Sequence, residues 1–92
     1  MSVNVLIPSA LRVFVDRQSE VEAEGATVGE ALANVAAQYP DLKHQIYEDD
    51  TNLRGFVNVF VDGTNLKKLH GLDTPVAAGA TVMIVPAIAG GY

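Results

Sequence analysis

The sequence predicts an α+β fold in which an open mixed sheet of four to five strands clasps one main helix. Apolar runs rich in β-branched residues stand near the start, in the second half and near the end of the chain, at 3–7, 56–61 and 81–85. One amphipathic helix precedes the second of these runs. The predicted order of strand, strand, helix, strand, short strand and strand gives a first hairpin, a crossover helix and a buried last strand. This arrangement is called a β-grasp.

The composition limits the chain to one domain and excludes several kinds of chemistry. With 92 residues, 49% of them apolar, the chain can bury a single core. It has no cysteine, which excludes disulfides, thiolate nucleophiles and cysteine-ligated metal sites. The net charge of −5 argues against nucleic-acid binding. Since neither a basic leader nor a run long enough to cross a bilayer is found, we expect a cytoplasmic protein that binds no membrane.

The first quarter of the chain predicts an antiparallel pair of strands. In 3–7 one face is fully apolar and the other is half apolar, which is typical of an interior strand, and Pro8 ends it. The segment 11–16 has no clear period and is interpreted as a loop or a short strand. In 20–24 glutamates alternate with valine and alanine, as in a strand with one exposed face, and Gly25 ends it.

A capping box marks the start of the main helix. Thr27 can accept a hydrogen bond from a free helix N–H while Glu30, three residues later, reaches back, so a helix is expected from Val28. Its apolar stripe is Val28, Leu32, Val35, Ala36 and Tyr39. Pro40 closes the helix, and 41–47 is expected to form a short second helical turn.

The second half supplies the remaining strands. The run 56–61 is dense in β-branched and aromatic residues, and Asp62-Gly63 after it predicts a tight hairpin that returns through 65–69. The run 81–85 shows no polar alternation after Thr81. We therefore expect it to pair in the centre of the sheet and to be covered on both faces.

The last residues are expected to form a flexible tail. Pro86 cannot donate a ladder hydrogen bond, so a β-grasp domain of residues 1–86 is expected to be followed by a flexible tail, 87–92, with a reach of roughly 20 Å. Gly90 and Gly91 would fit a slot too narrow for a Cβ and would leave a terminal acyl carbon unhindered. The alternative is an inert end, because many chains finish in small residues that have no function.

Three segments, 56–63, 71–76 and 82–91, resemble the ubiquitin-like sulfur-carrier proteins. This family includes the small subunit of molybdopterin synthase, the thiamine sulfur carrier and a carrier for cysteine synthesis. Ile7-Pro8 with Leu11-Arg12 is most similar to the cysteine-synthesis branch.

The resemblance implies a carrier that is not itself an enzyme and holds no cofactor or metal. A partner adenylyltransferase of the ubiquitin-activating type would use ATP to adenylate the carboxylate of Gly91, which a sulfur donor would convert to a thiocarboxylate. The tail residues Ala89, Gly90 and Gly91 would enter partner active sites. Sulfur would then pass to a biosynthetic enzyme, either one like cysteine synthase or one that makes a specialised sulfur-containing metabolite.

Tyr92 departs from the family pattern, in which the last glycine carries the reactive carboxylate. The resemblance implies that a zinc metalloprotease of the JAMM type cuts between Gly91 and Tyr92. The alternatives are that Tyr92 is not native or that it marks a carrier that has lost its activity.

Other residues have a functional and a structural interpretation. One candidate for partner docking is the pair Phe60 and Val59, whose alternative role is core packing. Another is the pair Lys67 and Lys68, whose alternative role is to keep an edge strand soluble. His44 and His70 are interpreted as surface histidines, and the acidic run 48–50 as a solvated loop rather than a calcium site.

Three rival functions follow from the same features. One is a molybdopterin synthase small subunit, which Tyr92 disfavours because it blocks Gly91. Another is a ubiquitin-like modifier joined through Gly91 to lysines of other proteins. The third is a plain binding module with an inert tail.

Overall fold

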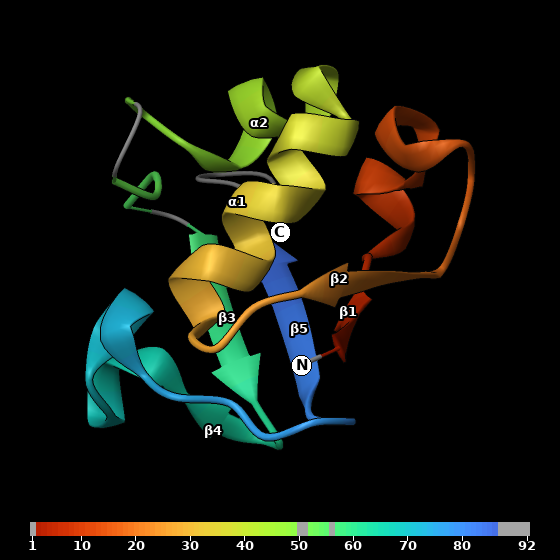
Figure 1. Cartoon of the computed structure of the whole chain (residues 1–92). Helices are drawn as coiled ribbons and strands as arrows, with labels where there is room; N and C mark the ends of the chain where they lie inside the picture. Colours follow the sequence, from red (N-terminus) through yellow and green to blue (C-terminus); the bar gives the residue numbers. More distant parts are fainter. Residues whose placement is uncertain (1, 50–51, 56, 87–92) are drawn as a thin grey trace.

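A computed structural model describes residues 2–49, 52–55 and 57–86, and these residues build a five-stranded mixed sheet with one long helix across one face (Figure 1). The strands lie in the order β2-β1-β5-β3-β4. β1 pairs antiparallel with β2 and parallel with β5, and β3 pairs antiparallel with β5 and β4. The strand bounds are β1 Ser2–Leu6, β2 Glu20–Glu24, β3 Val57–Val61, β4 Thr64–Asn65 and β5 Thr81–Pro86. The predicted β-grasp architecture is confirmed.

The main helix, α1 (Val28–Gln38), begins where the capping box predicts. The backbone N–H of Glu30 donates to Thr27 Oγ1 at 3.2 Å, and the Glu30 carboxylate accepts from the backbone N–H of Ala26 at 3.2 Å. The first bond satisfies a backbone donor that the first helical turn leaves free, and the second satisfies the N–H of the residue before the cap. Pro40 then starts the second helix, α2 (Pro40–Ile46), so the helical turn predicted after Pro40 is also confirmed.

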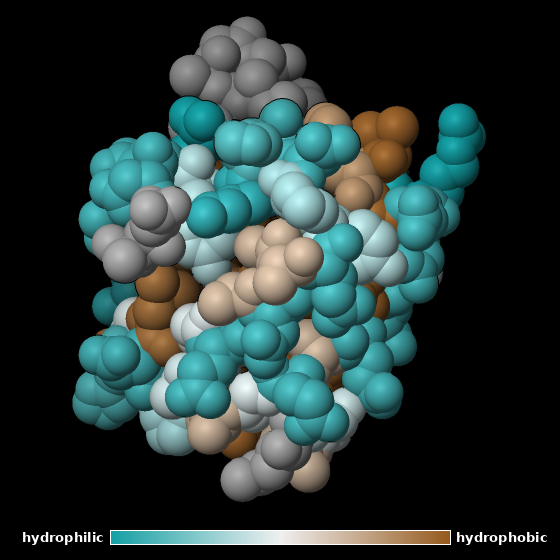
Figure 2. All heavy atoms as spheres, turned by 45° about the horizontal axis from the view of Figure 1, so that its top comes forward, coloured by the Kyte–Doolittle hydropathy of each residue, from teal (hydrophilic) through white to brown (hydrophobic). Residues whose placement is uncertain are grey.

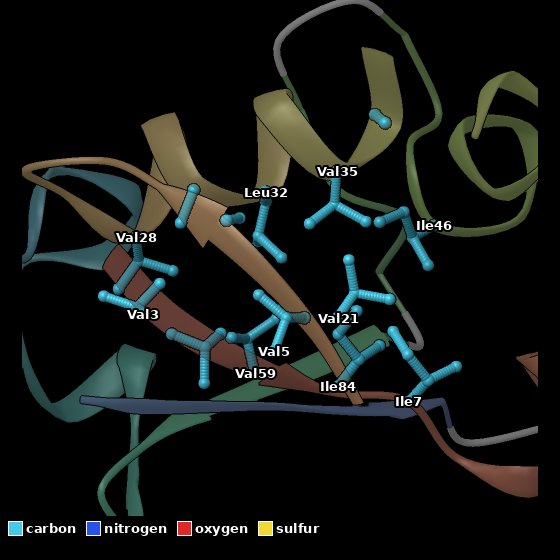
Figure 3. Close-up of a cluster of buried hydrophobic side chains, with 14 of the residues drawn as sticks. Val3, Val5, Ile7, Val21, Val28, Leu32, Val35, Ile46, Val59 and Ile84 are labelled. Atoms are coloured by element: carbon cyan, nitrogen blue, oxygen red, sulfur yellow. The ribbon is translucent and has the colours of Figure 1, made fainter. Parts of the chain in front are cut away.

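The core lies between α1 and one face of the sheet. Figure 3 shows side chains of β1, β2, β3 and β5 meeting those of α1 and Ile46 of α2 in this layer. The predicted helical stripe is buried at Val28, Leu32, Val35 and Ala36. Since α1 covers only this face, inward and outward residues alternate along every long strand.

The segment 11–16 is neither a loop nor a strand. It belongs to a 3-10 helix, η1 (Ser9–Val15), which buries Leu11 and Val15. Asp16 and Arg17 end η1 with positive φ angles of 55° and 63°.

The return strand predicted over 65–69 is much shorter than expected. β4 contains only Thr64 and Asn65, and a 3-10 turn, η2 (Leu66–Lys68), follows it. The side chain of Asn65 accepts a hydrogen bond from the backbone N–H of Lys67 at 2.8 Å. This cap stabilises the turn in place of a continued ladder. A further 3-10 turn, η3 (Gly71–Asp73), lies in the predicted turn-rich connection.

The prediction for β5 is right about its place and wrong about its covering. β5 lies in the centre of the sheet, between β1 and β3. Val82 and Ile84 point into the core and are fully buried, but Met83 and Val85 are 37% and 36% exposed. No described helix covers the second face of the sheet at these positions, so an uninterrupted apolar run here does not mean burial on both sides.

Polar residues dominate the part of the surface seen in Figure 2, where apolar residues form separate small areas between them. Within the described ranges, none of the helices is both long and apolar enough to span a membrane.

Candidate functional site

The predicted tail follows the central strand of the sheet. Pro86 is the last residue of β5, is half-buried, and stands opposite Val57 of β3. β1 runs parallel to β5 on the other side, with Leu6 opposite Met83. Pro86 itself is therefore held by β3, while β1 holds the first half of β5. The predicted site residues Ala89, Gly90, Gly91 and Tyr92, and the tail 87–92 as a whole, lie outside the described residues.

Apolar side chains line up on the outer face of the sheet beside this point. Leu6, Met83 and Phe60 occupy directly paired positions on β1, β5 and β3, so they share one face, and Val85 lies two residues further along β5. Leu6 and Phe60 are half-buried, while Met83 and Val85 are exposed. We call these four residues the outer strip. Sequence reasoning missed Met83 and Val85, although their alternation with Val82 and Ile84 would have revealed them once one face was known to be open.

The structure places the candidate docking residues in different surroundings. Phe60 belongs to the outer strip, but Val59 is 3% exposed and packs in the core, so the core-packing interpretation holds for Val59. Lys67 and Lys68 are exposed on η2. They follow Asn65, the strand partner of Phe60, by two and three residues, which places them at the β4 edge of the sheet.

A groove of about 570 Å³ lies at the end of the sheet where β1 and β5 finish. We call it the tail-root groove, because Pro86 is one of its lining residues together with Leu6, Pro8, Arg12, Glu20 and Met83. Arg12 is half-buried, and its Nε donates to the carbonyl of Ile7 at 3.0 Å. A half-buried arginine held by one backbone carbonyl is not evident from sequence, since the bond depends on the path of η1.

The part of the chain that the structure describes contains no cluster of metal-binding side chains. His44 and His70 are both exposed, as predicted, and no group of three histidine, aspartate or glutamate side chains in the described ranges could hold a metal ion. Burial raises the pKa of the Tyr47 hydroxyl, so this phenol is neutral at neutral pH and is not a base.

Comparisons with known proteins agree with this arrangement. A family model described as the ThiS family matches residues 5–91. The chain is 34% identical over 93 residues to the sulfur carrier protein CysO of Mycobacterium tuberculosis, a match that covers 99% of this chain and 100% of the relative.

Two solved structures have the same fold. The crystal structure of the Amycolatopsis orientalis BexX/CysO complex aligns with a TM-score of 0.87 and 36% identity, covering 97% of this chain and 99% of that one. The solution structure of small archaeal modifier protein 1 (SAMP1) from Methanosarcina acetivorans aligns with a TM-score of 0.88 and 28% identity, covering 98% and 96%. The family match includes the diglycine that the sequence singled out. The chain therefore belongs to the ThiS family of ubiquitin-like sulfur carrier proteins.

Proposed function

We propose that this carrier is charged as a thiocarboxylate on Gly91 after Tyr92 is removed, and that it then donates the sulfur to a biosynthetic enzyme. The observation that carries the proposal is the family match, which includes Gly91 and leaves Tyr92 outside it. The chemistry fits these residues. Adenylation turns the carboxylate oxygen into a good leaving group, and two glycines allow close approach to the acyl carbon.

The proposal assigns all catalytic groups to partner enzymes. An adenylyltransferase of the ubiquitin-activating type would use ATP on Gly91, and a JAMM-type metalloprotease would remove Tyr92. The acceptor would be an enzyme like cysteine synthase or one that makes a specialised sulfur-containing metabolite. Support for partner binding comes from the Amycolatopsis orientalis CysO, whose crystal structure is that of a complex with BexX.

Intact mass spectrometry tests the proposal directly. The chain is incubated with ATP, a sulfide donor and lysate from its own source. We expect loss of one tyrosine residue, followed by replacement of one oxygen by sulfur at the new terminus. A chain made to end at Gly91 is the positive control. An unchanged mass in a lysate that does charge this control would contradict removal of Tyr92, and failure of both chains to gain sulfur would contradict the carrier chemistry.

We further propose that the outer strip is the surface on which the activating partner docks. An apolar row across three central strands, half-buried at Leu6 and Phe60 and exposed at Met83 and Val85, is suited to burial in an interface. Replacing Met83 with glutamate should reduce the rate of thiocarboxylate formation by about tenfold or more, because a charge at the centre of a buried patch is costly.

Val13→Glu is the matched control for this substitution, since Val13 is 63% exposed but lies on η1, outside the outer strip. The rates of both variants are measured by intact mass in chains that end at Gly91. Equal rates for Met83→Glu and the parent chain, at protein concentrations below the KM of the parent, would show that the strip is not the docking surface.

A second candidate function is protein modification, in which Gly91 is joined to lysines of other proteins. It is favoured by the similarity to SAMP1, which is a modifier protein by name. Isopeptide-linked adducts of this chain, found by mass spectrometry of tryptic peptides from its own cells, would support it. Transfer of sulfur to a pterin, as by the small subunit of molybdopterin synthase, would use the same charged tail. Supplying the charged chain with a pterin acceptor and with a cysteine-synthase-like enzyme in separate reactions distinguishes these two destinations of the sulfur.

A further inference from the structure

The tail-root groove lies beside the end of β5, because Pro86, the last residue of that strand, is one of its lining residues. β1 runs parallel to β5 with Leu6 opposite Met83, and η1 begins three residues after Leu6. Ser9, Ala10 and Arg12 of η1 line the same groove, so they form the wall nearest the start of the tail.

Arg12 gives the groove a cation with unused hydrogen-bond donors. A guanidinium has five N–H donors, and Nε–H is bound to the carbonyl of Ile7. In the described part of the chain, the two Nη groups form no hydrogen bond or ion pair. Glu20 is the acidic side chain that lines the same groove, and it is exposed. A half-buried guanidinium with free Nη groups favours a carboxylate, which it can bind through two parallel hydrogen bonds.

The remaining walls are suited to the tail sequence. Leu6, Pro8 and Met83 give the groove an apolar lining, and the tail begins with Ala87-Ile88-Ala89 before its two glycines. In the chain that ends at Gly91, five residues with a reach of about 17 Å separate Pro86 from the terminal carboxylate. Apolar residues followed by an anion match an apolar groove that contains one arginine.

We propose that the tail of the chain ending at Gly91 binds in the tail-root groove, with its terminal carboxylate on Arg12. This inference rests on the proposed function, which generates that end. The groove and the outer strip share Leu6 and Met83, so a partner that docks on the strip competes with the bound tail. Docking would then release the tail at the moment when the partner's active site needs it, and a free carrier would keep its anionic end covered.

The test compares ¹⁵N-labelled chains by NMR without any partner enzyme. The reference is a chain that ends at Pro86. Relative to it, the chain ending at Gly91 should show shifted backbone amide signals at Leu6 and Ser9, and a shifted side-chain Nε–H signal of Arg12. Arg12→Gln should make the shifts at Leu6 and Ser9 smaller by about two- to fivefold, the range expected for loss of a partly exposed ion pair. The ¹H–¹⁵N NOE of Gly91 should fall in the same variant.

Two controls separate the carboxylate contact from a change in the fold. Arg17→Gln removes the same charge from an exposed residue that does not line the groove, and it should leave the shifts unchanged. A Gly91 carboxamide keeps Arg12 but removes the negative charge, and it should reproduce the effect of Arg12→Gln. If the carboxamide and the carboxylate chains give the same shifts, the contact with Arg12 is wrong; if the chains ending at Pro86 and Gly91 match at Leu6 and Ser9, the tail does not bind there.

The outcome is independent of the charging assay. A chain that gains sulfur normally but shows no tail-dependent shifts would overturn the bound tail and leave the proposed function intact. A chain that shows the shifts but never gains sulfur would overturn the carrier chemistry instead.

Discussion

A chain that ends at Gly91 and has valine in place of Gly90 is expected to form the thiocarboxylate about 100-fold more slowly than the parent chain. The branched side chain would keep the backbone from a narrow active-site slot and displace the acyl carbon from the adenylating groups. A displacement of about 1 Å in such a reaction costs about 100-fold in rate. The measurement is the initial rate of sulfur gain, followed by intact mass with the activating enzyme, ATP and sulfide.

Gly55→Ala is the control for a change of glycine outside the tail, because an added Cβ at Gly55 meets no atom within 4 Å. It should charge at the parent rate. The melting temperatures of all three chains should agree, which shows that the rate change does not come from unfolding. A Gly90→Val chain that is charged as fast as the parent would rule out a narrow slot at this position.

The parts of the fold that sequence predicts well are those with local causes. Thr27 and Glu30 are three residues apart and close a cap between neighbours, so no knowledge of the rest of the chain is needed to place the start of α1. Pro40 ends that helix because its ring disfavours helical geometry at the residue before it, Tyr39. The central place of β5 follows from its apolar run and the order of the elements.

The features that sequence did not predict depend on distant neighbours. Whether Met83 and Val85 are buried is decided by what lies on the second face of the sheet, which their own run does not reveal. Residues 9–15 form η1 because Leu11 and Val15 fill one side of the core, a role set by the packing of η1 and not by its composition. Arg12 becomes part of a groove only once β1 and β5 are paired in parallel.

The diglycine is a different case. Gly90 and Gly91 stand outside the described residues, so their proposed role comes from the sequence and the family match. The structure adds the position of Pro86, paired with Val57 of β3, and the surfaces beside it. The candidate site thus has two parts. The reactive end is proposed from chemistry, and the fold supplies the strand that precedes it, the outer strip and the tail-root groove.

The substitution with the largest expected effect on stability is Gly25→Ala. Gly25 is buried between β2 and α1, and a Cβ built there would lie 2.6 Å from the backbone nitrogen of Ala31 and 3.0 Å from its Cα. Both contacts are with the backbone of α1, so the helix would have to move away from the sheet. We expect a loss of about 3 kcal/mol in the free energy of unfolding, and a decrease in melting temperature on the order of 10–20 °C.

Thermal unfolding followed by circular dichroism measures this effect, again with Gly55→Ala as the matched change. Because an added Cβ at Gly55 meets no atom within 4 Å, Gly55→Ala should melt within a few degrees of the parent chain. A Gly25→Ala chain that melts like Gly55→Ala would mean that α1 can shift away from β2 at little cost. The layer between α1 and the sheet would then be looser than its fully buried residues, such as Leu32 and Val35, indicate.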